Sequence, residues 1–204
     1  STPLWVRFCS PFMNTPMSTL IYIHGFNSSP QSHKAGLLRQ WLAQHRPDIQ
    51  FIAPDLNVFP QQAIHLLAEL VQQYPQAGLL GSSLGGFYAT WLNQHYGNKA
   101  VLINPAVKAY DLLSKLLGEQ RNYHTGKGYI LTQAQVDELL AIEVDALKYP
   151  ERLWILLQTA DETLDYRLAL AKYPHSPMLV EEGGNHAFDS FEHHIPAIID
   201  FLHL

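Results

Sequence analysis

A serine surrounded by glycines is the strongest chemical signal in the sequence. Residues 81–85 read GSSLG and match the pattern G-x-S-x-G, with Ser83 at its centre. The apolar run 77–80 predicts a buried strand before the pattern, and the spacing of apolar residues from Leu84 onward predicts a helix after it. Between a strand and a helix, this pattern predicts a nucleophile elbow, a sharp turn that strains the serine backbone and exposes its hydroxyl oxygen. An ordinary turn or a phosphate-binding loop is the competing interpretation.

A serine hydroxyl becomes a good nucleophile only when a base takes its proton and a third group orients that base. Asp161 follows the predicted strand 153–157, and His186 lies in a loop after the predicted strand 178–180. In an open parallel sheet, active sites gather at the carboxyl ends of the strands. We therefore expect Ser83, Asp161 and His186 to form a triad of nucleophile, acid and base.

Other residues near these positions are weaker candidates. Asp161 could serve only as a helix N-cap, a position at which aspartate is common. Asp165 is the competing acid, but it falls inside the predicted helix 164–173 and points away. His193 and His194 are poorer bases because they lie within a predicted helix. Being adjacent, they project to different sides of that helix, and no H-E-x-x-H pattern occurs, so we predict no metal site.

Acyl transfer through such a serine also needs hydrogen-bond donors that stabilise the negatively charged oxygen of the tetrahedral intermediate. We expect the first donor to be the backbone amide of Leu84, the residue after the nucleophile. The second should come from the loop after the first strand, where Gly25 lets the backbone approach closely, and the amide of Phe26 is our choice. His24 is predicted to hold this loop rather than to act as a second base.

Strands and helices alternate along most of the chain and must place these side chains. The predicted strands are apolar on both faces and cover residues 19–23, 49–53, 77–80, 100–103, 153–157 and 178–180. The first predicted helix has Ser29 as its N-cap, and the others cover residues 61–74, 84–96, 164–173 and 190–202, the last with a bend at Pro196. This alternation predicts an α/β fold: a mostly parallel sheet with helices on both faces.

Residues 105–150 break the alternation, since they contain amphipathic pieces such as 134–147 but no convincing strand. An insertion of this length predicts a small helical cap over the carboxyl edge of the sheet. Its glycine-punctuated aromatic stretch would overhang the site, so Tyr123, His124 and Tyr129 are candidate residues of a substrate pocket. Ordinary packing of the cap on the core explains these three residues equally well.

Length and composition limit the remaining possibilities. A chain of 204 residues predicts one domain, here residues 17–204, with residues 1–16 as a peripheral N-terminal extension. A formal net charge of −5 argues against nucleic acid as a partner. No apolar run approaches the roughly 20 residues that span a bilayer. Cys9 is the only cysteine, which excludes a disulfide framework and favours a reducing, cytoplasmic location. The oligomeric state is not readable from the sequence.

With these residues assigned, the chain resembles the α/β-hydrolase superfamily, and more closely the small bacterial YqiA-like esterases. The resemblance runs from about Met17 to the C-terminus, and residues 1–16 have no counterpart. It is carried by YIHGFNSSP at 22–30, PDL at 54–56, GSSLGG at 81–86, NPA at 104–106 and GNH at 184–186. The resemblance implies an α/β-hydrolase fold in which Ser83 is the nucleophile, Asp161 the acid and His186 the base. It also implies a carboxylesterase that acts on carboxylic esters or acyl thioesters without a metal or an organic cofactor.

The predicted mechanism is two-step acyl transfer through an acyl-enzyme intermediate, with a small-molecule acyl ester or thioester as the substrate. A cofactor-free haloperoxidase or a peptidase could use the same triad. A non-catalytic ligand-binding protein on this scaffold would normally lack a triad member, and none is missing here. An epoxide or haloalkane hydrolase would need aspartate at position 83, so Ser83 argues against that class.

Overall fold

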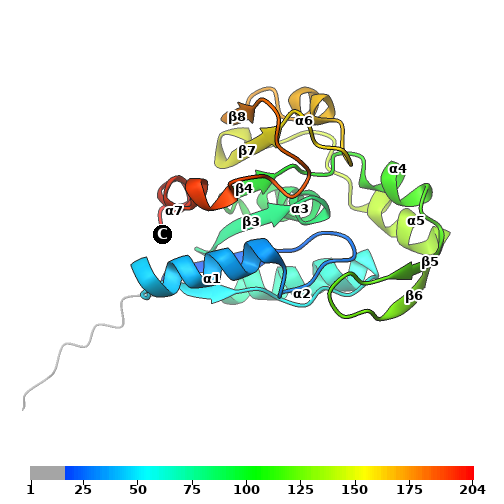
Figure 1. Cartoon of the computed structure of the whole chain (residues 1–204), viewed down its shortest axis with the longest axis horizontal. Coiled ribbons are helices and arrows are strands. Elements are labelled where there is room, and N and C mark those ends of the chain that lie inside the picture. Colours follow the sequence, from blue (N-terminus) through cyan, green and yellow to red (C-terminus); the bar gives the residue numbers. More distant parts are fainter. Residues whose placement is uncertain (1–16) are drawn as a thin grey trace, which may run out of the picture.

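A parallel β-sheet forms the centre of the molecule (Figure 1). The computed structural model describes residues 17–204, so the predicted extension at 1–16 lies outside the described residues. The strands are β1 (Thr19–Ile23), β2 (Gln50–Ile52), β3 (Gly78–Ser82), β4 (Ala100–Ile103), β7 (Leu153–Gln158) and β8 (Met178–Glu181). They lie in the order β2-β1-β3-β4-β7-β8, and every neighbouring pair is parallel. The predicted α/β class is confirmed.

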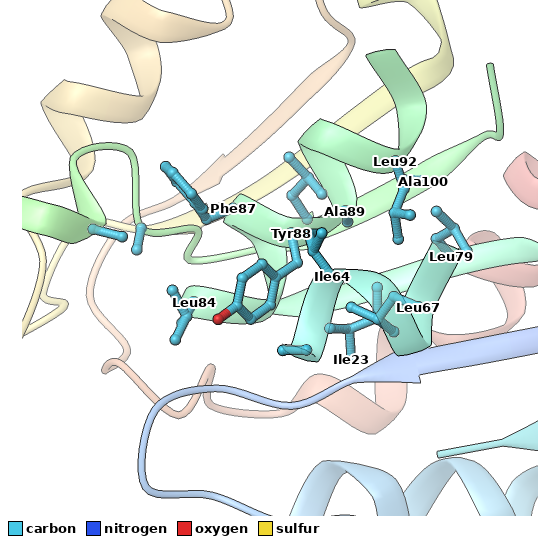
Figure 2. Close-up of a cluster of buried hydrophobic side chains, with 14 of the residues drawn as sticks. Ile23, Ile64, Leu67, Leu79, Leu84, Phe87, Tyr88, Ala89, Leu92 and Ala100 are labelled. Carbon is cyan, nitrogen blue, oxygen red and sulfur yellow. The ribbon is translucent and has the colours of Figure 1, made fainter. Parts of the chain in front are cut away.

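Helices cover both faces of this sheet. They are α1 (His33–His45), α2 (Pro60–Gln73), α3 (Leu84–Tyr96), α6 (Tyr166–Lys172) and α7 (Ile195–Leu202). α1 and α7 share one buried cluster with the sheet, whereas α2, α3 and α6 share the other. Figure 2 shows part of the second cluster, in which Ile23 and Leu79 of the sheet meet Leu67 of α2 and Leu92 of α3. Because both faces are covered, the strands are apolar on both sides.

The insertion between β4 and β7 is not purely helical, which corrects the prediction of a helical cap without strands. It contains α4 (Ala109–Ser114), β5 (Gly118–Arg121), β6 (Gly128–Leu131) and α5 (Gln133–Ala141). β5 and β6 form an antiparallel hairpin, on the right of Figure 1. Among the eight residues of these two strands, Leu131 alone is buried. The two strands of this hairpin therefore lack the apolar pattern that predicts a buried strand.

Two helix boundaries also differ from the prediction. Ser32, not Ser29, is the N-cap of α1, and its hydroxyl accepts a hydrogen bond from the first turn of that helix. The predicted helix 190–202 is a 3-10 helix at Phe191–His194 followed by α7. Pro196 lies in the first turn of α7, where no amide donor is needed, and not in the middle of one continuous helix.

Candidate active site

The turn between β3 and α3 holds Ser83 in a strained backbone conformation. Its φ of 55° and ψ of −117° lie in a region that residues with a side chain rarely adopt. The amide of Ser83 donates to the carbonyl of Ile103, and its carbonyl accepts from the amide of Ala106, both at 3.0 Å. A Cβ on Gly85 would lie 1.9 Å from the carbonyl oxygen of Ile23 in β1, so this turn requires glycine there. The chain thus makes a tight elbow that is locked against both neighbouring strands.

Three side chains that are far apart in the sequence meet beyond the carboxyl ends of β3, β7 and β8. His186 Nε2 lies 3.1 Å from Ser83 Oγ. His186 Nδ1 lies 2.8 Å from Oδ2 and 3.0 Å from Oδ1 of Asp161. An ionised carboxylate can only accept, so it fixes the imidazole proton on Nδ1 and leaves Nε2 to accept from the serine hydroxyl. This is the tautomer in which an imidazole can take a serine proton.

Asp161 is held by its own turn as well as by the imidazole. Its Oδ1 accepts from the amides of Thr163 and Leu164, both at 2.8 Å, and its side chain is only 2% exposed. It therefore closes a turn and faces the imidazole at the same time. The competing acid Asp165, predicted to lie inside a helix, is instead the N-cap of α6 and pairs with Arg167 at 2.7 Å.

Two backbone amides beside Ser83 are free to bind an anion. Within residues 17–204, the amides of Phe26 and Leu84 donate to no protein acceptor. Leu84 is the first residue of α3, so its amide lies at the positive end of the helix dipole. Phe26 follows Gly25, where an added Cβ would lie 3.2 Å from the Cβ and 3.8 Å from the Oγ of Ser83. The loop after β1 therefore lies directly against the serine side chain.

His24 ties this loop to the segment after β2. Its Nδ1 lies 2.9 Å from the carbonyl oxygen of Gly25, and its Nε2 accepts from the amide of Leu56 at 3.1 Å. Both bonds need a neutral ring that carries its proton on Nδ1. Burial lowers the pKa of His24 below its usual value of 6.5, which favours this neutral form. These contacts agree with the structural role predicted for His24.

We expect acid to destabilise the fold through His24. Since the pKa of His24 is lower in the folded chain, the unfolded chain takes up this proton first as the pH falls below 6.5. Stability that is present above pH 6.5 is therefore lost as the pH falls toward the lower, folded-state pKa. In urea unfolding at pH 7 and pH 5, His24→Asn should lose less free energy of unfolding than the wild type, because asparagine does not titrate. Equal losses in the two proteins would contradict this assignment.

Three side chains with no role predicted from the sequence hold the loop that carries His186. Asn104, directly after β4, donates from Nδ2 to the carbonyl oxygens of Asn185 at 3.0 Å and His186 at 3.1 Å. Gln158, the last residue of β7, accepts from the amide of Asn185 at 3.1 Å. Glu162 Oε2 accepts from the amide of His186 at 2.9 Å. The sequence feature that could have identified Asn104 and Gln158 is their polar character at the ends of apolar strands.

A cavity of about 550 Å³ opens beside the two free amides. Its lining includes Phe26 and Leu84, together with Tyr129 from the hairpin. Of the three candidate pocket residues, Tyr129 is in this lining, whereas Tyr123 is 80% exposed and, like His124, lies outside it. A larger hollow of about 1000 Å³ lies at the amino ends of the strands, on the opposite edge of the sheet from the elbow. The smaller cavity is on the same edge of the sheet as the elbow, and its lining includes Gly25 and Leu84, which lie next to Ser83.

One protein family matches the chain almost from end to end. Residues 19–203 match the uncharacterised protein family UPF0227. The chain belongs to this family. A UPF0227 protein of Yersinia enterocolitica is 26% identical over 190 residues, and one of Serratia proteamaculans is 28% identical over 192 residues. Each comparison covers 89% of this chain and 97% of the relative.

Solved structures show that this UPF0227 chain has the α/β-hydrolase fold, as the sequence resemblance predicts. Est1E from Butyrivibrio proteoclasticus has a TM-score of 0.70 at 15% identity, and the match covers 93% of this chain and 89% of Est1E. Alpha/beta hydrolase domain-containing protein 10 from mouse has a TM-score of 0.67 at 17% identity, with 92% and 89% covered. At such low identity, the likeness establishes the fold alone.

The part of this UPF0227 chain that the structure describes has neither a cluster of potential metal ligands nor a helix that could span a membrane. Within residues 17–204, no three His, Cys, Asp or Glu side chains form a group that could hold a metal ion. His194, one of the two adjacent histidines, pairs with Glu181 at 3.2 Å. None of the helices described in this range combines the length and the apolar character that crossing a bilayer requires.

Proposed function

We propose that this protein is a serine hydrolase that cleaves carboxylic esters or acyl thioesters through an acyl-enzyme intermediate. The observation that carries the proposal is the chain of hydrogen bonds from Ser83 through His186 to Asp161. A hydroxyl, an imidazole and a carboxylate in this order make the hydroxyl oxygen nucleophilic. Proteins of the same fold add support, since Est1E has been solved with ferulic acid bound and a Pyrococcus furiosus protein is an esterase.

In the first half-reaction, Ser83 Oγ attacks the carbonyl carbon of the substrate while His186 Nε2 takes the hydroxyl proton. Asp161 stabilises the imidazolium that forms. The carbonyl oxygen becomes an oxyanion and accepts from the amides of Phe26 and Leu84, and one such donor typically contributes about 3 kcal/mol. When the bond to the leaving group breaks, the departing alcohol or thiol takes the proton from His186. The acyl group remains on Ser83.

In the second half-reaction, water takes the place of the leaving group. His186 removes one proton from the water while its oxygen attacks the acyl carbon, and the same two amides stabilise the oxyanion. Breaking the bond to Ser83 Oγ releases the carboxylic acid and returns the proton to the serine. One ester and one water give one acid and one alcohol or thiol, so no co-reactant besides water is required.

The cavity beside the amides suits the acyl group of a small molecule. Its volume of about 550 Å³ is typical of small-molecule sites. Its lining combines apolar residues such as Leu66 and Leu113 with polar residues such as Gln62 and Lys127. We therefore propose that the acyl group binds in this cavity. A panel of p-nitrophenyl esters and acyl thioesters of graded length would measure which acyl groups it accepts.

A fluorophosphonate probe tests the proposal before any substrate is known. The wild type should gain one phosphonyl group, located by peptide mapping at Ser83, because the His186 base makes this oxygen reactive. Ser83→Ala should gain none, and intact mass spectrometry measures both outcomes. A wild type that resists labelling would contradict the proposal and favour a ligand-binding protein on this scaffold.

A further inference from the structure

Asn27 has an unusual backbone conformation next to one of the two free amides. Its φ of 54° lies in the left-handed region, which residues other than glycine adopt rarely, although asparagine tolerates it better than most. It follows Phe26 directly and is 7% exposed. Within its own turn, the amide of Ser28 donates to the carbonyl of Gly25 at the long distance of 3.3 Å. Because this bond within the turn is weak, contacts with other parts of the chain are needed to fix the conformation of the loop.

Both ends of the Asn27 side-chain amide are bound by the β5–β6 hairpin. The hydroxyl of Tyr129 in β6 donates to Oδ1 at 2.5 Å. Nδ2 donates to Oε1 of Gln120 in β5 at 3.2 Å. Burial raises the pKa of Tyr129 to about 12, so its hydroxyl keeps the proton that this bond requires. One side chain of the loop is therefore bound to both strands of the hairpin.

The backbone of the loop is bound to the same hairpin. The amide of Tyr123, in the turn between β5 and β6, donates to the carbonyl of Asn27 at 3.0 Å. Asn122 Nδ2 donates to the carbonyl of Ser28 at 2.8 Å. Four hydrogen bonds thus join the hairpin to two consecutive residues of the loop. Of the hairpin strands only Leu131 is buried, and Tyr129 packs against the same core cluster, so most of the hairpin's side chains are not held by core packing.

We infer that the β5–β6 hairpin positions the oxyanion-binding loop, residues 24–29, through Asn27. Asn27 and Tyr129 are then positioning residues for the reaction proposed above. The inference rests on that proposed function, because the amide being placed is the donor of Phe26. Tyr129 also lines the cavity in which the acyl group binds. The same side chain therefore contacts the substrate site and fixes the loop that stabilises the oxyanion.

Three variants separate this role from a general loss of structure. Asn27→Gly keeps the left-handed backbone accessible and removes the side-chain amide. Tyr129→Phe removes one hydroxyl and keeps the ring in the cavity. Tyr123→Phe is the matched control, because it removes the hydroxyl of an 80% exposed tyrosine on the same hairpin and leaves the backbone bond to Asn27 in place.

Steady-state kinetics with p-nitrophenyl butyrate gives the first measurement. Since complete loss of an oxyanion donor costs about 10²- to 10³-fold in kcat, a displaced donor should lower kcat by about tenfold in Asn27→Gly and Tyr129→Phe. KM should change by less than about twofold, because the donor acts mainly on the transition state. The Tyr123→Phe control should match the wild type in both parameters.

Hydrogen–deuterium exchange of residues 24–29 gives a second measurement that does not depend on activity. Exchange there should be faster in Asn27→Gly and Tyr129→Phe than in the wild type and the control. If the wild type is active and Asn27→Gly and Tyr129→Phe both have the wild-type kcat, the inference is overturned. It is also overturned if exchange in residues 24–29 is the same in both variants as in the wild type. In a third outcome, the wild type neither hydrolyses esters nor reacts with the fluorophosphonate, while the two variants still exchange faster than it does. That result would overturn the proposed function, but it would confirm that the hairpin holds the loop in place.

Discussion

Replacing Ser83 by alanine is expected to lower kcat/KM for a p-nitrophenyl ester by about 10⁶-fold, since triads act as a unit and lose most of their rate when the nucleophile is removed. The alanine has no oxygen to form the acyl-enzyme, so only the rate supported by the two amides and by substrate binding should remain. Steady-state hydrolysis of p-nitrophenyl butyrate, with circular dichroism to verify folding, measures the effect.

Ser82→Ala is the matched control for this variant. Ser82 is the neighbouring serine of the same glycine-rich stretch, but it is the last residue of β3 and is 6% exposed. We expect its replacement to leave kcat/KM within a few fold of the wild type. Folded Ser83→Ala protein that retained near wild-type hydrolysis would exclude this serine as the nucleophile.

Replacing Asp161 by asparagine is expected to lower kcat by about 10⁴-fold, as reversal of the histidine tautomer does in other triads. An asparagine amide can donate to His186 Nδ1, which would move the imidazole proton to Nε2. That nitrogen could then no longer accept from Ser83 Oγ. The asparagine oxygen can still accept from the amides of Thr163 and Leu164, so we expect the turn to be preserved.

Asp165→Asn provides the comparison for this prediction. Asp165 was the rival acid in the sequence, and in the structure it caps α6 and pairs with Arg167. Its replacement should lower stability only slightly, because an ion pair in solvent contributes little, and should leave kcat near the wild-type value. A larger loss of kcat in Asp165→Asn than in Asp161→Asn would reverse the assignment of the acid.

The sheet was predictable because burial on both faces restricts the composition of its strands. β1 and β4 begin and end at the predicted residues, and β7 and β8 extend by one residue beyond the prediction. The meeting of Ser83, Asp161 and His186 was predictable for a related reason. Each follows a parallel strand, and the carboxyl ends of such strands share one edge of the sheet.

The contacts that organise the hairpin could not be read from the sequence. The hairpin is bound to Asn27 and Ser28 by hydrogen bonds from its strands and its turn, and such polar contacts leave no periodic apolar pattern. The start of α1 was misplaced for a different reason. Ser29 and Ser32 are both capable N-caps, and the tertiary position of the loop decides which of them the helix uses.

The cap leaves the sheet after β4 and returns before β7, so it carries none of Ser83, Asp161 and His186. Evolution or an engineer could exchange this segment for another and alter the acyl preference while the chemistry stays where it is. Such a graft must also supply a donor and an acceptor for the amide at position 27. Under the proposal made above, the hydrogen bond between Asn27 and Tyr129 links the choice of acyl group to the binding of the oxyanion, so neither can be redesigned without regard to the other.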